Sequence, residues 1–354
     1  MNKQRILIYG VVLAILAALV YVQFRHWQSF DWARFVENTR NVSWLHVFYG
    51  ILLIYLAYVL RAVRWRVFLR PVRKDVSLVS LVSATLVGFT GLAILGRPGE
   101  LIRPYLIARR TNLSFSSQLA VWTVERIFDL AAFTVLMVAA IFLPTDLRAF
   151  VADRPAYHHW LQVAGYLLSA LVLGLFGVAL LIRYQGPVIA DWVENRFAHL
   201  AKNLGARIAL RIREFAKGLD TIHGAVALLQ IAVTSLIMWW FIAWSYHEVA
   251  YAYGTPMQDM SVTRVLLLLG SSMVGSMLQL PGVGGGSQLA TIEVLDKVFQ
   301  VPGEIAVSCG ILLWLVSFVA VIPVGLLLAH QERLSLRAVA EESEKAETNA
   351  VSRT

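Results

Sequence analysis

The sequence predicts an all-α polytopic integral membrane protein, and three observations carry this prediction. Of the 354 residues, 58% are hydrophobic and only 15% are charged, against about 25% charged in an average soluble domain. Several uninterrupted apolar runs approach or reach the ~20 residues that a membrane-crossing helix needs. Basic residues gather in particular loops, as the positive-inside rule expects of cytoplasmic loops. These features exclude a disordered chain and a single soluble globule.

The charge balance indicates contact with anionic lipid headgroups. There are 31 basic and 22 acidic residues, which gives a net charge of +9, and no base-stacking or groove-reading module accompanies it, so a nucleic-acid partner is not expected. The single cysteine, Cys309, lies in an apolar run and provides neither a disulfide nor a thiolate metal site. His158 and His159 are adjacent and cannot form an i, i+4 metal pair. We expect no metal and no cofactor.

Residues 1–44 are predicted to form a signal-anchor helix and an external loop. The apolar run Ile6–Val22 follows Lys3 and Arg5 and ends without a small-x-small cleavage site. It therefore resembles an uncleaved anchor, with the N-terminus in the cytoplasm.

Sidedness predicts that residues 45–143 form a first repeat of span, hairpin and span. Simple crossing by the apolar run 78–95 would place Arg73 and Arg109 on opposite sides of the membrane, against the positive-inside rule. A re-entrant hairpin over 78–107, turning near Pro98, keeps both arginines cytoplasmic, and its glycines and proline suit a broken helix. The alternative is an ordinary kinked span. The further apolar stretches cover about residues 45–65, 78–95, 127–143, 161–182, 226–247, 263–280 and 305–329.

Residues 226–329 are predicted to repeat this pattern upside down. The segment 263–299 contains a Pro/Gly-rich stretch that cannot continue as helix, and it is expected to form a second hairpin entering from outside. The prediction therefore has about six full spans plus two broken hairpins, arranged as inverted repeats. Paired Gly/Pro-interrupted segments in inverted repeats indicate a transporter binding site. The predicted second turn comprises Pro281, Gly282, Gly284, Gly285 and Gly286.

The basic loop 183–225 and the tail are predicted to be cytoplasmic, and the span 161–182 returns the chain to that side. Residues 144–225 hold a linking span and a basic loop, which forms either an amphipathic helix on the inner leaflet or a plain helical linker. Residues 330–354 are rich in glutamate and poor in apolar residues, and we expect a disordered cytoplasmic tail.

The segment 96–105 is the strongest candidate for a binding site. Charged side chains at membrane depth are costly unless they pair or face water, and arginine can hold a phosphate through two parallel hydrogen bonds. Glu100 lies three residues from both arginines and is able to orient either. The segment thus predicts a lipid-headgroup site, or alternatively an internal salt bridge at the hairpin turn. The predicted binding residues are Gly96, Arg97, Gly99, Glu100 and Arg103.

A second charged group opens the span 127–143. Glu125 and Asp129 are four residues apart and share a helix face, with Arg126 beside them. They are candidates for proton or cation coupling or for acid and base in a transferase. The third interpretation is that they neutralise Arg103 or Arg109. The glycines of 281–286 suit backbone anion binding, or serve only to break the helix.

These motifs resemble the lysylphosphatidylglycerol synthase transmembrane-region family, also described as flippase-like or uncharacterised inner-membrane proteins. The resemblance rests on Gly96-Arg-Pro-Gly-Glu-Leu-Ile-Arg-Pro-Tyr, on Ser114-Phe-Ser-Ser and on Val124-Glu-Arg-Ile-Phe-Asp-Leu, and it covers nearly all of residues 5–330. The Pro-Gly-Val-Gly-Gly-Gly segment falls at the second break of that family. Residues that match the motifs are Gly96, Arg97, Gly99, Glu100, Arg103, Glu125, Arg126 and Asp129.

The resemblance implies lipid translocation across the bacterial inner membrane, or a membrane domain attached to a headgroup-modifying enzyme. Some relatives are associated with hopanoid biosynthesis and transport. Synthase members carry a soluble aminoacyltransferase domain, which this sequence lacks after its short tail, so aminoacylation is not expected. Many relatives place an acidic residue after the second glycine break, where this chain has Ser287-Gln-Leu-Ala.

We therefore predict a flippase-like transporter without catalytic residues. Its substrate would be an anionic or amphipathic lipid, such as a phospholipid, a polyprenyl phosphate or a hopanoid-type lipid. One alternative is a non-catalytic scaffold or partner subunit for an envelope lipid- or glycan-modifying enzyme. Another is an intramembrane transferase that uses Glu125 and Asp129.

Overall fold

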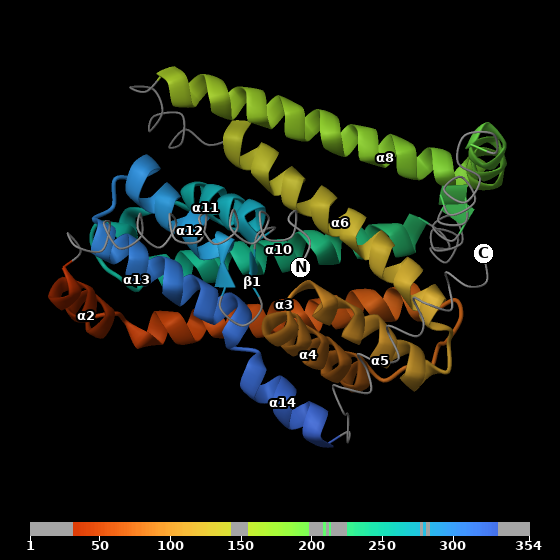
Figure 1. Cartoon of the computed structure of the whole chain (residues 1–354), viewed down its shortest axis with the longest axis horizontal. Coiled ribbons are helices and arrows are strands. Elements are labelled where there is room, and N and C mark those ends of the chain that lie inside the picture. The colour runs from red at the N-terminus through yellow and green to blue at the C-terminus, as the bar shows by residue number, and fades with distance from the viewer. Residues whose placement is uncertain are drawn as a thin grey trace, which may run out of the picture.

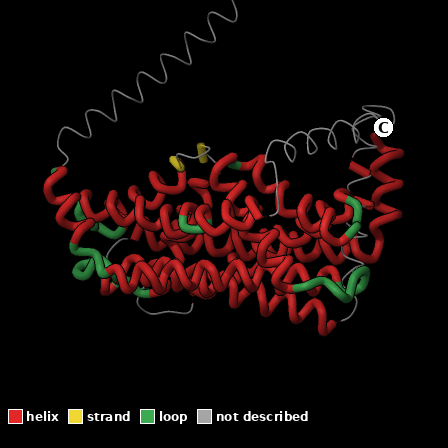
Figure 2. The backbone as a smooth tube through the Cα atoms, turned by 90° about the horizontal axis from the view of Figure 1, so that it is seen from below, coloured by secondary structure: helices red, strands yellow, loops and turns green. Residues whose placement is uncertain are grey.

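The protein is a bundle of α-helices, most of which run side by side along its long axis (Figures 1 and 2). The structure is a computed structural model that describes residues 31–142, 155–197, 208–209, 212–213, 225–276, 279–280 and 284–331. The predicted anchor over 6–22 and the predicted disordered tail beyond Gln331 lie outside these residues.

The helices of the first half follow the predicted apolar runs. The run 78–95 is helical over the same residues, whereas the helix predicted over 127–143 begins twelve residues earlier, at Phe115. The elements are α2 (Trp32–Arg40), α3 (Trp44–Leu69), α4 (Leu78–Leu95), the 3-10 helix η1 (Arg97–Leu101), α5 (Ile102–Thr111) and α6 (Phe115–Phe142).

The second half has the same order of long and broken helices. Two helices contain a π-helical stretch near their C-terminal ends. The elements are α8 (Pro155–Phe197), α10 (Ala225–Tyr251), the 3-10 helix η2 (Met257–Asp259), α11 (Val262–Gly275), strands β1 (Gln279–Leu280) and β2 (Gly284–Gly285), α12 (Gly286–Glu293), the π-helix η4 (Val294–Val298), α13 (Gly303–Trp314), the π-helix η5 (Leu315–Val319) and α14 (Ile322–Gln331).

Within the described residues, four helical segments are long and apolar enough to cross a membrane. They are Trp44–Leu69, Leu78–Leu95, Val226–Tyr251 and Gly303–Gln331. Helix α6 has 28 residues, but its charged residues interrupt the apolar window. The fold class is therefore all-α with membrane-spanning helices, as the sequence predicts.

The chain reverses direction between α4 and α5. Gly96 ends α4 with a left-handed φ of 71°, and α5 then returns along α4. A side chain at Gly88 would overlap Arg103 on α5, and one at Gly99 would overlap the backbone of Gly91, so these glycines allow the close packing. At the open end, Arg73 and Arg110 line one pocket of about 200 Å³. The segments before and after this hairpin therefore meet at the same end.

A second reversal joins α11 to α12. The two helices pack where Gly275 meets the backbone of Gly286, and between them β1 and β2 form a two-residue antiparallel ladder. The tip, residues 281–283, lies outside the described residues. Figure 1 shows α4 and α5 toward one end of the long axis and α11 and α12 toward the other.

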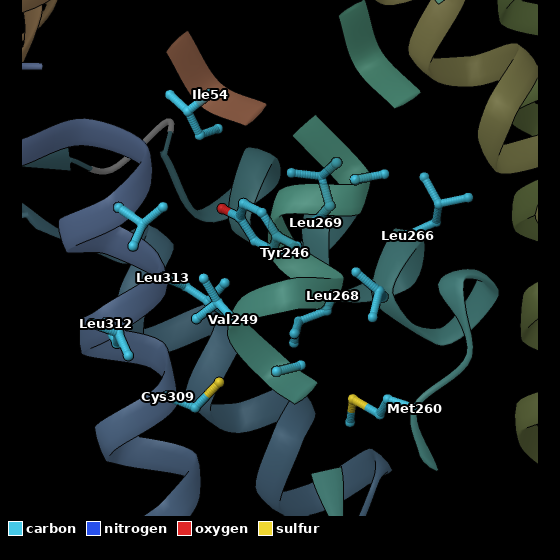
Figure 3. Close-up of a cluster of buried hydrophobic side chains, with 14 of the residues drawn as sticks. Ile54, Tyr246, Val249, Met260, Leu266, Leu268, Leu269, Cys309, Leu312 and Leu313 are labelled. Atoms are coloured by element: carbon cyan, nitrogen blue, oxygen red, sulfur yellow. The ribbon is translucent and has the colours of Figure 1, made fainter. Parts of the chain in front are cut away.

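Two buried apolar clusters hold the bundle together. The larger one lies between α3, α10, α11 and α13, where Tyr246, Leu269 and Leu313 are among the packed side chains (Figure 3). Helices α3 and α10 pack closely at Gly50, whose carbonyl oxygen accepts a hydrogen bond from Ser245 Oγ at 2.8 Å. The smaller one surrounds Trp65 and packs α3 and α4 against α5, α6 and α10.

Helix α2 forms inside the segment expected to be an external loop. Its N-terminus is capped by the Asp31 side chain, which accepts a hydrogen bond from the Arg34 N–H at 3.0 Å. At its other end Thr39 contacts the hydroxyl of Ser308 on α13 at 2.7 Å, and Ser308 contacts the Tyr253 hydroxyl at 2.7 Å. Burial raises the pKa of this Tyr253 hydroxyl, so it acts as a neutral hydrogen-bonding group.

Helix α8 joins the predicted linking span to the start of the basic loop. The run 161–182 continues to Phe197 through a non-helical residue, Gln185, just before Pro187. Arg213 contacts Asp191 at 2.6 Å and Glu194 at 2.9 Å on α8. The rest of the predicted amphipathic segment lies mostly outside the described residues.

Candidate functional site

Five charged side chains form a buried cluster between α3, α5 and α6. The cations are Arg61 and Arg64 on α3 and Arg103 on α5, and the anions are Glu125 and Asp129 on α6. Each of these side chains is at most 8% exposed. We call these five residues the charged cluster.

Helical spacing places the members of the charged cluster on facing surfaces. Arg61 and Arg64 are three residues apart, and Glu125 and Asp129 are four residues apart, so each pair shares one face of its helix. Arg103 reaches the same space because α5 packs closely against Gly88 of α4.

Glu125 is the centre of the charged cluster. Its Oε1 accepts from Arg64 Nη2 at 2.6 Å, and its Oε2 accepts from the indole N–H of Trp65 at 2.8 Å. Arg103 donates to both carboxylate oxygens, with Nη1 3.1 Å from Oε1 and Nη2 in contact with Oε2. Such bidentate arginine–carboxylate contacts are strong and geometrically specific.

Asp129 joins the two arginines of α3. Arg61 Nη1 donates to Oδ2 at 3.0 Å, and Arg64 Nη1 lies 2.7 Å from Oδ1. Arg64 Nη1 also donates to Ser235 Oγ on α10 at 2.7 Å, which connects the charged cluster to the second half of the chain.

The charged cluster carries an excess of positive charge. Three guanidinium groups face two carboxylates, so one positive charge is not compensated within the cluster. Burying an uncompensated charge inside a membrane protein is costly for stability, and such charges commonly mark functional sites.

A small cavity lies beside the charged cluster at the first hairpin. It measures about 20 Å³ and is lined by the charged residues Glu100, Arg103 and Arg126, together with Gly88, Phe89, Leu92 and Trp122. The Arg126 side chain is 39% exposed and lies 3.6 Å from Asp129. The cavity has room for about one water molecule.

Aromatic rings cover the guanidinium groups of the charged cluster. The ring centroid of Phe89 on α4 is 5.1 Å from the Arg61 guanidinium and 5.5 Å from that of Arg103. Trp65 lies 5.2 Å from the same Arg103 group. These cation–π contacts stabilise cations away from water.

The sequence of the chain matches one protein family over most of its length. Residues 7–325 match the family described as "Lysylphosphatidylglycerol synthase TM region". The chain belongs to this family. Together with the membrane-spanning helices, the match shows that the chain is a multi-pass membrane protein.

The chain is similar to the protein named "Glycosyltransferase AglD" of Haloferax volcanii. It is 27% identical over 200 residues, which cover 51% of this chain and 31% of the relative. The chain thus matches about a third of that relative's length. No solved structure matches the chain.

Only some of the binding residues predicted at the first turn contact the charged cluster. Arg103 belongs to it, and Glu100 lines the small cavity. Gly96 makes the turn, and Gly99 allows the approach to α4. The side chain of Arg97 lies outside the described residues. The expected orientation of Arg103 by Glu100 differs from the structure, where Arg103 binds Glu125.

Glu125 and Asp129 therefore neutralise arginines, as one of the predicted interpretations states. Their partners are Arg103 and the two arginines of α3, whereas Arg109 is exposed at the end of α5. Arg126 lies at the edge of the charged cluster rather than inside it.

At the predicted second turn of this family member, Gly284 and Gly285 form strand β2 and Gly286 begins α12. The N–H of Gly285 donates to Gln288 Oε1 at 2.6 Å, so this donor already has a partner within the chain. Pro281 and Gly282 lie outside the described residues. The predicted anion cradle therefore stays a prediction.

Sequence reasoning missed the contribution of α3 to the site. Arg61 and Arg64 lie at the end of the apolar run 45–65, where basic residues commonly flank a span, so the local pattern does not distinguish them from flanking charges. The signal that identifies them is their spacing with Trp65, since residues three and four apart share a helix face inside a 26-residue helix.

Proposed function

We propose that this protein moves an anionic or amphipathic lipid between the leaflets of the bacterial inner membrane. The observation that carries the proposal is the charged cluster, which holds an excess positive charge inside a membrane protein and adjoins a cavity lined by Glu100, Arg103 and Arg126. An anionic headgroup would compensate this charge, while its acyl or prenyl chains stay in the lipid. The protein would then lower only the desolvation cost of the headgroup.

The packing of the two halves supports an inverted-repeat transporter. The hairpin helix α4 of the first half packs against α14 of the second, and the hairpin helix α11 of the second packs against α6 of the first. Helices α3 and α10, which open the two halves, pack against each other. Inverted repeats of this kind place substrate sites between broken helices.

In the proposed mechanism the α4–α5 hairpin moves to admit the headgroup. The small cavity holds about one water in this structure, so a headgroup enters only when α5 separates from α6. Arg126 is the partly exposed arginine of the small cavity, so it would contact the headgroup first. The headgroup would then pass to Arg103. Glu125 and Asp129 would keep the arginines oriented while the headgroup passes.

The test is leaflet exchange of a fluorescent anionic phospholipid by the full chain in phosphatidylcholine vesicles. The variants are Arg97→Ala and Arg126→Gln, which remove a charge outside the charged cluster, and the control is Arg109→Ala on the exposed end of α5. We expect the two variants to slow exchange about tenfold or more and the control to match the unmodified protein. Exchange at the unmodified rate in both variants would contradict the proposal.

A second candidate is a membrane partner for an enzyme of envelope lipid or glycan metabolism. It is favoured by the names of the matches, one a synthase TM region and the other a glycosyltransferase. For this function we expect a soluble enzyme to co-purify with the full chain, and no exchange by the purified protein alone. Exchange by the purified protein without a partner would favour translocation.

A further inference from the structure

Phe89 lines a second cavity as well as the small one. It measures about 130 Å³ and lies between α3, α10, α11 and η5. We call it the apolar cavity, because its walls are largely hydrocarbon, including Ile54, Ala57, Ile242, Leu269, Met273 and Phe318. An apolar cavity of about this size holds a benzene-sized group, which corresponds to a short stretch of methylenes or a single prenyl unit.

A charged group makes the apolar cavity more than a packing defect. Arg61 of the charged cluster lines it, and this arginine uses Nη1 for Asp129 at 3.0 Å. Two further lining residues, Trp239 and Ser317, have an indole N–H and a hydroxyl without a hydrogen-bond partner among the described residues, and both atoms are themselves buried.

Two hydroxyl groups of the cavity wall already have partners. Tyr58 donates to the Ser317 carbonyl oxygen at 3.3 Å, and the Tyr246 hydroxyl contacts Ser272 Oγ at 3.1 Å. The charge at the wall is that of Arg61, a member of a cluster with excess positive charge. This combination favours an occupant that has an anionic head and a slim apolar chain.

We propose that the apolar cavity binds a single-chain acidic amphiphile, with its acidic head at Arg61 and the first part of its chain between α10 and α11. This site is separate from the small cavity assigned to headgroup passage. The proposal concerns binding, so it is tested independently of translocation.

The test is binding of dodecyl phosphate to the full chain in phosphatidylcholine nanodiscs, measured by native mass spectrometry. Ser276→Phe fills the cavity, and Ser271→Phe is its matched control. Ser271 lies in the last part of α11 and Ser276 directly follows this helix. Both donate to the carbonyl oxygen three residues earlier at 2.7 Å, but only Ser276 lines the cavity. We expect Ser276→Phe to weaken binding about tenfold or more and Ser271→Phe to leave it unchanged.

A further comparison identifies the chemistry of the occupant. Dodecyltrimethylammonium, a cation with the same chain, is expected not to bind. The proposal is overturned if Ser276→Phe binds dodecyl phosphate as the unmodified protein does, or if the cation binds equally well. Loss of binding in Ser271→Phe as well would also count against the site.

Discussion

At the residue scale, the charged cluster behaves as one unit because its carboxylates are shared. Glu125 accepts from Arg64, Trp65 and Arg103, and Arg64 contacts both carboxylates of the cluster. Removing one member therefore leaves several buried partners without compensation. Breaking a buried ion pair in this way costs about 3–5 kcal/mol.

Glu125→Gln is expected to destabilise the protein severely. The amide keeps the shape but removes the negative charge, so Arg103 loses its counter-ion and Arg64 keeps only Asp129. We expect a loss of about 3–5 kcal/mol in the free energy of unfolding, measured by denaturant titration in mixed micelles. Glu37→Gln on the exposed face of α2 is the control, with an expected change within about 0.5 kcal/mol. Equal unfolding midpoints for both variants would show that the charged cluster contributes little stability.

Ser308→Ala is expected to loosen the attachment of α2. The substitution removes the contacts with Thr39 and Tyr253, both at 2.7 Å, at a cost of about 1–3 kcal/mol. Limited proteolysis near α2 should become faster in this variant. The control is Ser77→Ala, an exposed N-cap residue whose side chain makes no capping hydrogen bond. Unchanged cleavage in Ser308→Ala would mean that apolar packing alone holds α2.

At the element scale, the first hairpin depends on glycines that bring two helices into backbone contact. Gly88 faces Arg103, and Gly91 faces Ile102 and Gly99. Because Arg103 sits directly at the contact, the spacing of α4 and α5 also sets the geometry of the charged cluster.

Gly88→Ala is expected to be destabilising although alanine favours helices. Its methyl group would overlap the Cβ and backbone of Arg103, and overpacking of this kind costs about 1–3 kcal/mol. Gly174→Ala on α8 is the matched control, because a Cβ there meets nothing within 4 Å, and alanine should gain about 0.5–1 kcal/mol. Denaturant unfolding midpoints measure the stability change in both variants. A stabilised Gly88→Ala variant would contradict the observed packing.

Helix ends were predictable where an apolar run stops at a capping or helix-breaking residue. The segment 78–95 is bounded by Ser77 and Gly96, and its ends are recovered to the residue. Helix α6 was predicted too short, because Glu125 and Arg126 interrupt the apolar pattern immediately before residue 127. The pairing of α3 with α6 through buried charges is a tertiary contact, and local periodicity carries no information on it.

At the scale of the whole molecule, the hairpin places two basic segments at one end. Arg73 and Arg110 line the same pocket, and Arg110 donates to Ser80 and Ser83 near the start of α4. This is the arrangement that sidedness predicts from the sequence. Which helices of the two halves pack together was not predictable, since it depends on side-chain shape across distant segments.

Cysteine labelling in inverted and right-side-out vesicles tests this arrangement. Asp75→Cys and Asn112→Cys both lie at the pocket shared by Arg73 and Arg110, and both are expected to react from the cytoplasmic side only. Glu37→Cys on α2 is expected to react from the other side. The native Cys309 is buried and should not interfere. Labelling of positions 75 and 112 from opposite sides would contradict the hairpin.

The ring of Phe89 has a consequence for the energy balance of the cell. It lines both cavities and lies within 5.5 Å of the guanidinium groups of Arg61 and Arg103. A row of charges through a bilayer would otherwise conduct small ions and discharge the proton gradient. For the proposed lipid passage, an aromatic ring shared by the two cavities would keep the resting protein closed to small ions, so that translocation and an intact membrane potential are compatible.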